Sequence, residues 1–174
     1  MDHTIPLQKN IPERPNIHAS YGIRSDTEGL LPWEWVSERM AKSRNYWICS
    51  TQLDGRPHAM PVWGVWIEDV FFFGTNRASV KGRNLASNPR VALHLESGDE
   101  AVMIEGIVVE VKEMENLTAI AAAYSQKYPG YCPDPSIESE VAMYAVQPKR
   151  VMAWLEDDFV NSATRWRFDH GDKG

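Results

Sequence analysis

Apolar and polar residues alternate along most of the chain between residues 46 and 155, and this alternation is typical of half-buried β-strands. Asp54-Gly55 and Glu68-Asp69 interrupt it as tight hairpin turns. The pattern predicts strands over 46–53, 58–67, 70–75, 91–96, 101–111, 141–147, 151–155 and 164–168. Consecutive antiparallel strands with few helices predict a mainly β fold, in which the sheet is a closed or nearly closed barrel.

Three segments depart from the alternation and show helical spacing instead. Residues 30–43 place Trp33, Val36 and Met40 on one side of a helix. Residues 79–87 begin at Ser79, a good N-cap residue, and residues 113–128 form a longer helical stretch. Within the fifth strand, Glu105-Gly106 marks the position of a β-bulge.

The length of 174 residues is that of one domain. Residues 1–27 are rich in proline and polar groups and are expected to form an N-terminal arm. Residues 28–170 are expected to form a single β-barrel domain, followed by a flexible tail at 171–174. No internal repeat or low-complexity tract is present.

Composition and charge exclude several classes of protein. The net charge is −6, whereas a bulk nucleic-acid or membrane-surface binder is usually basic. No apolar run approaches the ~20 residues of a membrane-spanning helix, and no secretory leader is expected. Cys49 and Cys132 provide no disulfide framework, which fits a cytoplasmic setting.

No strong catalytic signature is present, so the sequence identifies no catalytic residue. It contains no HExxH, GxSxG or CxxC motif and no glycine-rich nucleotide loop. His58 and His94 fall on neighbouring predicted strands and are the candidates for a metal pair. Lone strand histidines are more often surface or core residues, and no metal is expected. Cys49 is better explained as a small buried apolar residue than as a nucleophile.

The segment from Thr75 to Leu85 concentrates polar chemistry at a junction between a strand and a helix. It contains Arg77, Lys81 and Arg83 together with hydroxyl and amide side chains. Amide groups at a helix N-terminus and nearby cations both favour an anion, so the segment predicts a phosphate site. A solvated basic helix face is the alternative. Lys81 and Arg83 would point in different directions on a regular helix.

Two further segments suggest a flat ligand. Pro61 lies inside a predicted strand and removes one ladder donor, which indicates a sheet edge or a backbone that faces a ligand. Near the C-terminus, Arg165-Trp166-Arg167 could contact a flat or anionic ligand through cation–π and charge-assisted contacts. The alternatives are a barrel edge packed by Trp and an amphipathic last strand.

Taken together, these motifs resemble the pyridoxamine 5′-phosphate oxidase-like superfamily of split β-barrel flavin and deazaflavin proteins. The resemblance extends from about residue 31 to residue 168. It rests on the order of the segments 44–47, 54–58, 60–66, 73–75, 79–91, 105–106 and 162–168. It implies a homodimer with two cofactor sites at the subunit interface, and FMN or F420 as the cofactor.

The resemblance also implies roles for particular residues. Ser79, Lys81 and Arg83, with the neighbouring Asn84, match the segment that binds the cofactor phosphate. Thr75 matches a hydroxyl at the end of the adjoining strand. The residues that match the strand along the cofactor ring are Met60, Pro61, Val62 and Trp63. Those that match C-terminal cofactor contacts, often made from the partner subunit, are Trp166 and Arg167.

One departure narrows the expected activity. True pyridoxamine phosphate oxidases carry an Arg-x-x-x-Leu-Lys pattern on the second strand, whereas residues 58–63 contain neither Arg nor Lys. This speaks against vitamin B6 oxidation, and the Lys-x-Arg-Asn-Leu motif is more similar to the F420-dependent reductase branch. The expected function is that of an FMN- or F420-dependent oxidoreductase acting on a small organic substrate. The alternative is a non-catalytic carrier or sensor that binds a flavin, a deazaflavin or haem.

Overall fold

A computed structural model describes residues 11–134, 136 and 138–168 of the chain. The helices are α1 (Trp33–Lys42), α2 (Val80–Ser87), α3 (Met114–Lys127) and α4 (Phe159–Ser162), with a 3₁₀ turn, η1, at Ala19–Tyr21. The strands are β1 (Tyr46–Thr51), β2 (Pro57–Val62), β3 (Gly64–Ile67), β4 (Val70–Asn76), β5 (Arg90–His94), β6 (Glu100–Glu110), β7 (Val141–Leu155) and β8 (Thr164–Arg167). No described helix is long and apolar enough to cross a membrane.

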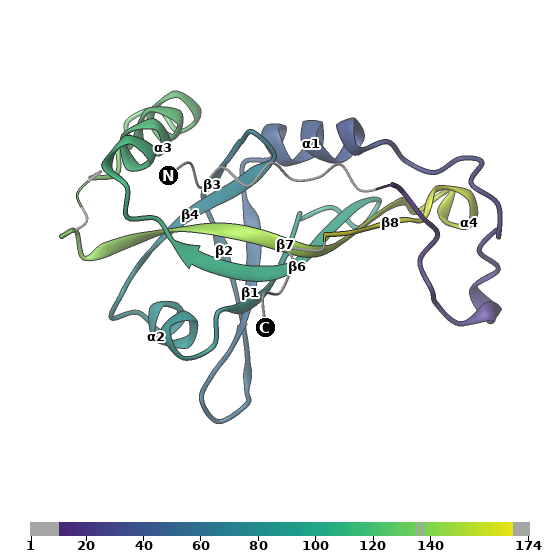
Figure 1. Cartoon of the computed structure of the whole chain (residues 1–174), viewed down its shortest axis with the longest axis horizontal. Coiled ribbons are helices and arrows are strands. Elements are labelled where there is room, and N and C mark those ends of the chain that lie inside the picture. Colours follow the sequence, from purple (N-terminus) through teal and green to yellow (C-terminus); the bar gives the residue numbers. More distant parts are fainter. Residues whose placement is uncertain (1–10, 135, 137, 169–174) are drawn as a thin grey trace.

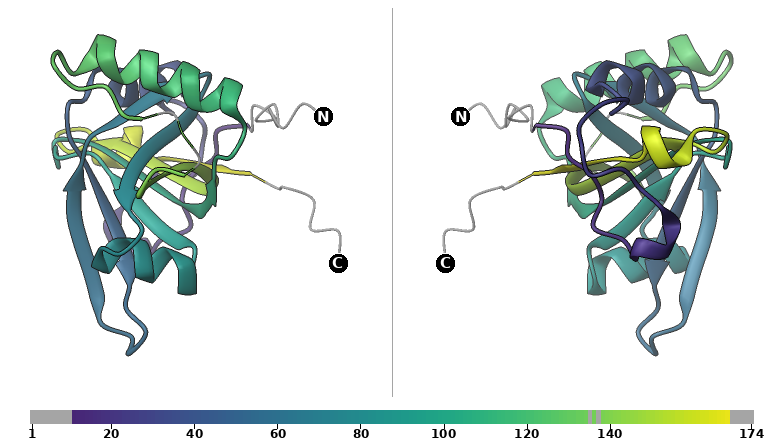
Figure 2. Two further views of the ribbon diagram at one scale, coloured as in Figure 1. Left: turned by 90° about the vertical axis from the view of Figure 1, so that its left-hand side faces the viewer. Right: turned by 90° about the vertical axis from the view of Figure 1, so that its right-hand side faces the viewer.

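The described strands form one curled antiparallel sheet in the order β2-β1-β5-β6-β7-β4-β3, and β8 pairs with β7 (Figure 1). The curled sheet confirms the predicted mainly β split-barrel fold. In both views of Figure 2, α3 lies at one end of the barrel and α2 at the opposite end. The two ends of the sheet, β2 and β3, are consecutive in the chain, so the residue between them joins opposite edges of the sheet.

That residue is Trp63, and it corrects one expectation. The alternation predicts an unbroken strand over 58–67, whereas the structure ends β2 at Val62 and begins β3 at Gly64. β2 pairs with β1, while β3 pairs with β4. The chain changes its partner at Trp63 without losing the alternation of its side chains, so the hydrophobic pattern does not reveal the break.

A second difference concerns β7, which is one continuous strand of 15 residues where the pattern predicts two. Pro148 interrupts the pattern but not the strand, because the register shifts beside it, between Glu105 and Gly106 of β6. The predicted bulge is therefore confirmed. Gly106 permits the close approach, since a Cβ there would lie 2.3 Å from the Gln147 carbonyl oxygen.

The concave side of the sheet holds the main core. Val36 and Met40 of α1 are buried there, together with Ile48 and Leu93 from the strands. α3 packs over the β3–β4 end and forms a second apolar cluster that includes Leu117, Ile120 and Tyr124. The convex side carries the alternate residues of β1, β5, β6 and β7.

Residues 11–30 run beside the C-terminal strand. Glu13 and Arg165 exchange backbone hydrogen bonds of 2.9 and 2.8 Å. The Arg14 guanidinium donates to the carbonyl oxygens of Asp26 and Asn161, at 2.7 and 2.5 Å. The described part of the expected arm is thus held against β8 and α4. Residues 1–10 of that arm, and the expected tail at 171–174, lie outside the described residues.

Candidate functional site

Residues 75–82, which join β4 to the first turn of α2, bring several hydrogen-bonding groups together at a helix N-terminus; we call them the anion turn, after the phosphate predicted there. Ser79 caps the helix, and its Oγ accepts a hydrogen bond from the Gly82 amide at 2.9 Å. The Thr75 Oγ1, at the end of β4, lies 3.1 Å from the same Ser79 Oγ. Gly82 lets this first turn sit on the preceding loop, because a Cβ there would lie 2.4 Å from the Asn76 carbonyl oxygen. The amides at a helix start lack intrahelical acceptors and favour negative charge.

Lys81 supplies an unpaired cation at this turn. The residue is only 9% exposed, yet its ammonium group has no anionic or hydrogen-bonding partner among the described residues. Its Nζ lies 5.9 Å from the centre of the Phe73 ring. Burial lowers the pKa of Lys81 to about 8. A buried cation without a partner costs stability, and an anion would offset that cost.

The other polar residues of the predicted phosphate segment differ in burial and in their partners. Asn84 is buried, and its Nδ2 donates to the Ser50 Oγ of β1 at 3.1 Å, which anchors α2 to the sheet. Arg83 is exposed and donates to the Ala78 carbonyl oxygen. Lys81 and Arg83 therefore point in different directions on a regular helix. Arg77 is held away from α2 by an ion pair with Glu110 at 2.8 Å.

The free edge of β2 presents more acceptors than donors, because only Ala59 among its outward-turned residues keeps an N–H. The Arg56 carbonyl accepts from the Gln52 amide, so alternate residues of β2 from that point turn their backbone toward β1. Pro57, Ala59 and Pro61 consequently turn theirs to the open side, where no described strand pairs with them. The two prolines have no N–H, which protects the edge from a further strand and leaves their carbonyl oxygens available.

β2 runs from the neighbourhood of α2 to Trp63, the residue at which the chain passes from β2 to β3. Near its start, His58 lies opposite Ser50, the residue held by Asn84 of α2. At its end, Trp63 contacts Tyr124 of α3 and Tyr128, the residue that follows α3. Met60 is exposed along this path, while Val62 is buried in the core. A molecule with a phosphate at α2 and a flat ring farther along β2 would follow this edge.

Trp63 forms an aromatic surface at the break. Its ring is stacked on Tyr128 with centroids 4.6 Å apart and planes inclined by 9°. Tyr131 meets it edge-on at 5.5 Å. Trp63 remains 41% exposed, so part of the indole is open. The sequence offers Tyr124, Tyr128 and Tyr131, near the third predicted helix, as possible proton donors or packing residues, and it gives no role to Lys127. The polar tip of Lys127, at spacing i+3 from Tyr124, is the signal that places it beside them.

Of the two predicted C-terminal cofactor contacts, Trp166 lies in the core and Arg167 lies on the surface. Trp166 is 1% exposed and packs edge-on against Trp33 at 5.6 Å, so its ring does not line a surface site of its own chain. Alternation along β8 turns Trp166 inward, which fits the alternative of an amphipathic last strand, and a cofactor contact by this residue stays a prediction. Arg167 is exposed and forms an ion pair with Glu13 at 2.7 Å.

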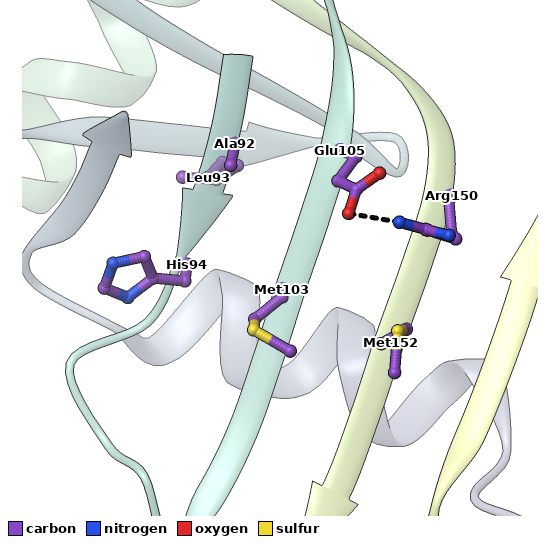
Figure 3. Close-up of a pocket in the computed structure, with 7 residues that line it drawn as sticks. All are labelled: Ala92, Leu93, His94, Met103, Glu105, Arg150 and Met152. Carbon is purple, nitrogen blue, oxygen red and sulfur yellow. Dashed lines mark hydrogen bonds and ion pairs between the residues drawn. The ribbon is translucent and has the colours of Figure 1, made fainter. Parts of the chain in front are cut away.

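A pocket on the convex side of the sheet is lined by other kinds of side chain than the turn at α2 (Figure 3). Met103 and Met152 form its floor, and the Glu105–Arg150 ion pair of 2.5 Å lies beside them. Its arginine is thus already neutralised. His94 lines this pocket, whereas His58 lies on the concave side opposite Ser50, so the two histidines cannot share a metal. The described residues hold no group of three or more His, Cys, Asp or Glu suited to a metal ion.

We predict that stability depends on pH in two opposite ways. Burial lowers the pKa of Lys81 and of Lys127 to about 8 in the folded chain, whereas unfolded lysines titrate near 10.4. From about pH 8 to 10 the unfolded chain binds more protons, so stability should rise with pH. Burial raises the pKa of Tyr46 and of Tyr124, so stability should fall above about pH 10.

Thermal unfolding between pH 7 and 11 checks this prediction. The midpoint should pass through a maximum between about pH 9 and 10. Replacing both lysines, Lys81→Met with Lys127→Met, should flatten the rise, while Lys42→Met, an exposed lysine, should leave it intact. A midpoint that falls steadily from pH 8 upward would contradict the assigned burial of the two amines.

Comparison with solved structures identifies the same fold in other proteins, all at low sequence identity. A conserved hypothetical protein from Mycobacterium tuberculosis is 22% identical over 76% of this chain and 89% of its own, with a TM-score of 0.65. An F420 reductase is 21% identical over 66% of this chain and 94% of its own, with a TM-score of 0.53. A haem storage protein from Vibrio cholerae is 15% identical over 65% and 87%, with a TM-score of 0.56.

No curated protein matches the sequence. A sequence model of the pyridoxamine 5′-phosphate oxidase family does match, over residues 34–155. These residues include β1 to β6, the anion turn at α2, the break at Trp63 and all of α3. Given this match and the split-barrel fold, the chain belongs to the pyridoxamine 5′-phosphate oxidase family.

Proposed function

We propose that the protein binds FMN or F420 and acts as an oxidoreductase on a small organic substrate. The cofactor supplies the hydride chemistry, and the chain supplies binding, orientation and shielding from water. The neighbour described as an F420 reductase shares the fold and supports this choice. The neighbour described as a haem storage protein is the reason to test binding and turnover separately.

The observation that carries the proposal is Lys81. The residue is largely buried, its ammonium group has no hydrogen-bond or ion-pair partner among the described residues, and it lies in the first turn of a capped helix. A phosphate at this turn would receive a charge-assisted bond from Lys81 and hydrogen bonds from the helix amides. FMN and F420 both carry phosphate, so the residues present fit either cofactor.

The free edge of β2 supports the position of the ring. FMN and F420 share a ring edge on which an N–H lies between two carbonyl groups. The exposed carbonyl oxygens of Ala59 and Pro61 can accept from that N–H. The part of the cofactor that links its phosphate to its ring would then span the distance from α2 to Trp63 along β2. The exposed part of the Trp63 indole would lie beside the ring.

The proposal includes a homodimer. The convex side of the sheet leaves Met103 and Met152 uncovered by any described helix, with Glu105 and Arg150 side by side. A two-fold axis through such a surface would place each charge near its opposite on the second copy. Arg167 lies one strand away from Arg150 and would then lie near the partner subunit.

Cofactor loading tests the proposal. The protein is purified from a host that makes both cofactors, its bound molecule is identified by mass and absorption, and FMN and F420 are titrated separately into the stripped protein. We expect one of them to bind with micromolar or lower Kd, and sedimentation to give the mass of two chains. Reduced cofactor on the protein should then be reoxidised by added organic acceptors.

The controls separate the alternatives. Riboflavin, which lacks the phosphate, should bind at least tenfold more weakly than FMN if Lys81 holds that group. Equal affinity for the two would contradict the phosphate site. A tightly bound cofactor that no acceptor reoxidises would identify a carrier instead of an enzyme, and haem in place of flavin would overturn the proposal.

A further inference from the structure

Three side chains at the C-terminal end of α3, from Tyr124, Lys127 and the C-cap residue Tyr128, hold the two peptide groups on either side of Gly64, where β2 becomes β3. The Tyr124 hydroxyl donates to the Trp63 carbonyl oxygen at 2.9 Å. The Lys127 ammonium donates to the Gly64 carbonyl oxygen at 3.0 Å. The Tyr128 hydroxyl accepts from the Gly64 amide at 3.0 Å. We call these three α3 residues the hinge clamp.

The hinge clamp replaces hydrogen bonds that the sheet cannot provide. At Trp63 the chain has left the ladder with β1, and it joins the ladder with β4 only from Gly64 onward. Gly64 is buried, so unpaired backbone groups there would each cost about 1–3 kcal/mol. Side chains from a separate helix supply the partners, and the orientation of this peptide is therefore set by α3.

The hinge clamp is itself anchored at its far side. The Tyr128 hydroxyl also donates to the Arg44 carbonyl oxygen at 2.7 Å, just before β1. The Lys127 ammonium also donates to the Tyr46 hydroxyl at 2.5 Å. The Tyr46 hydroxyl in turn donates to the Met40 carbonyl oxygen at the end of α1. Met40, Tyr46 and Tyr128 are buried, and these hydrogen bonds connect the hinge to α1, β1 and α3 together.

The same helix also fixes the Trp63 side chain. The Tyr128 ring lies parallel to the indole with centroids 4.6 Å apart, so one residue contacts both the backbone of the hinge and its ring. Lys127 and Tyr128 are adjacent, and Tyr124 lies one turn earlier on the same face of the helix. A displacement of α3 would therefore turn the Trp63 carbonyl, the Gly64 peptide and the indole as a unit.

We infer that the hinge clamp positions the ring site, so that α3 sets how β2 and the Trp63 indole meet the cofactor ring. This inference rests on the proposed function, because it assigns the β2 edge to a ring. Tyr124, Lys127 and Tyr128 act through Trp63 and Gly64 and are positioning residues. Their contribution concerns the ring alone, since the phosphate turn lies at the opposite end of the barrel (Figure 2).

The test compares the binding of FMN and of inorganic phosphate, with F420 replacing FMN if that is the cofactor bound. In Tyr124→Phe and in Tyr128→Phe we expect the Kd for FMN to rise about fivefold, the effect of one lost hydrogen bond. The Kd for inorganic phosphate, measured by competition, should stay within a factor of two. The visible absorption bands of bound FMN should shift, because the ring environment changes. A purely structural role would not separate the two affinities.

Tyr131→Phe is the matched control. Tyr131 packs against the same indole, but the described residues give its hydroxyl no hydrogen-bond partner. This variant should retain the wild-type Kd and spectrum. Lys127→Met provides a second variant, whose folding is checked by circular dichroism because it removes the hydrogen bonds to Tyr46 and Gly64; it should behave like Tyr124→Phe.

The outcomes are distinguishable. If the wild-type protein binds neither FMN nor F420, the proposed function fails and the inference falls with it. If the wild-type protein binds and the clamp variants match the Tyr131→Phe control in Kd and spectrum, the inference alone is overturned. An equal loss of affinity for FMN and for phosphate would also overturn it, because it would indicate general loosening of the fold.

Discussion

Replacing Trp166 by alanine is expected to lower the free energy of unfolding by about 3–5 kcal/mol, the range observed for large aromatic residues in protein cores. The side chain is 1% exposed, lies opposite Val151 in the β7–β8 ladder and packs against Trp33. The residual cavity would lie between α1 and the sheet, which cannot easily close over it. Urea unfolding followed by circular dichroism measures this change.

Two companion variants sharpen the result. Trp166→Phe keeps most of the ring volume and removes the buried indole N–H, which has no described hydrogen-bond partner, so its cost should be well below that of alanine. Arg167→Met, on the exposed neighbour, should cost about 1 kcal/mol or less because it removes only a surface ion pair. A tenfold loss of FMN affinity in Trp166→Phe with unchanged stability would return Trp166 to the ring site.

Trp166 also shows that a motif can locate a strand without showing which of its residues face the core. The Arg-Trp-Arg alternation predicts β8 correctly, because period 2 is a property of the backbone. Which of the two alternating sets faces the core depends on the neighbouring strand and on α1, 130 residues earlier in the chain. The sequence supports both an amphipathic strand and a cofactor contact, and the packing against Trp33 favours the amphipathic strand.

The change from β2 to β3 at Trp63 illustrates a different limit of prediction from sequence. Turn residues and alternation predict most of the strands to within a few residues, and Ser79 and Gly106 are found where their chemistry requires them. Nothing local distinguishes residue 63 from the strand around it, since its neighbours alternate on both sides. At the break, the backbone is hydrogen-bonded to Tyr124 and Tyr128, more than 60 residues later, and such distant partners leave no local pattern.

The anion turn was predictable in place but not in detail. Three cations within a few residues at a strand–helix junction predict the position of the site, and helical spacing predicts that Lys81 and Arg83 diverge. The sequence does not say which of them is buried. The structure places Lys81 inward and leaves Arg83 on the surface, because the inward face of α2 is the one anchored through Asn84 to β1.

Replacing Lys81 by methionine is expected to change binding and stability in opposite directions. The variant removes the buried cation, and charge-assisted hydrogen bonds are worth about 1.5–3 kcal/mol, so the Kd for FMN or F420 should rise about 10- to 150-fold. The free energy of unfolding of the cofactor-free protein should stay equal or increase, because methionine fills the same space without a desolvated charge. Titration calorimetry and urea unfolding measure the two effects on the same samples.

Arg83→Met is the comparison that isolates the effect of burial. The exposed guanidinium of Arg83 should contribute fivefold or less to affinity, since solvent screens it. If Arg83→Met weakened binding more than Lys81→Met, the phosphate would have to lie on the outer face of α2. If Lys81→Met weakens cofactor binding but does not lower the free energy of unfolding, the charge of Lys81 destabilises the folded chain until an anion binds. This is the expected behaviour of a binding residue. A lysine that served only to support the fold would lose stability on substitution and leave the affinity unchanged.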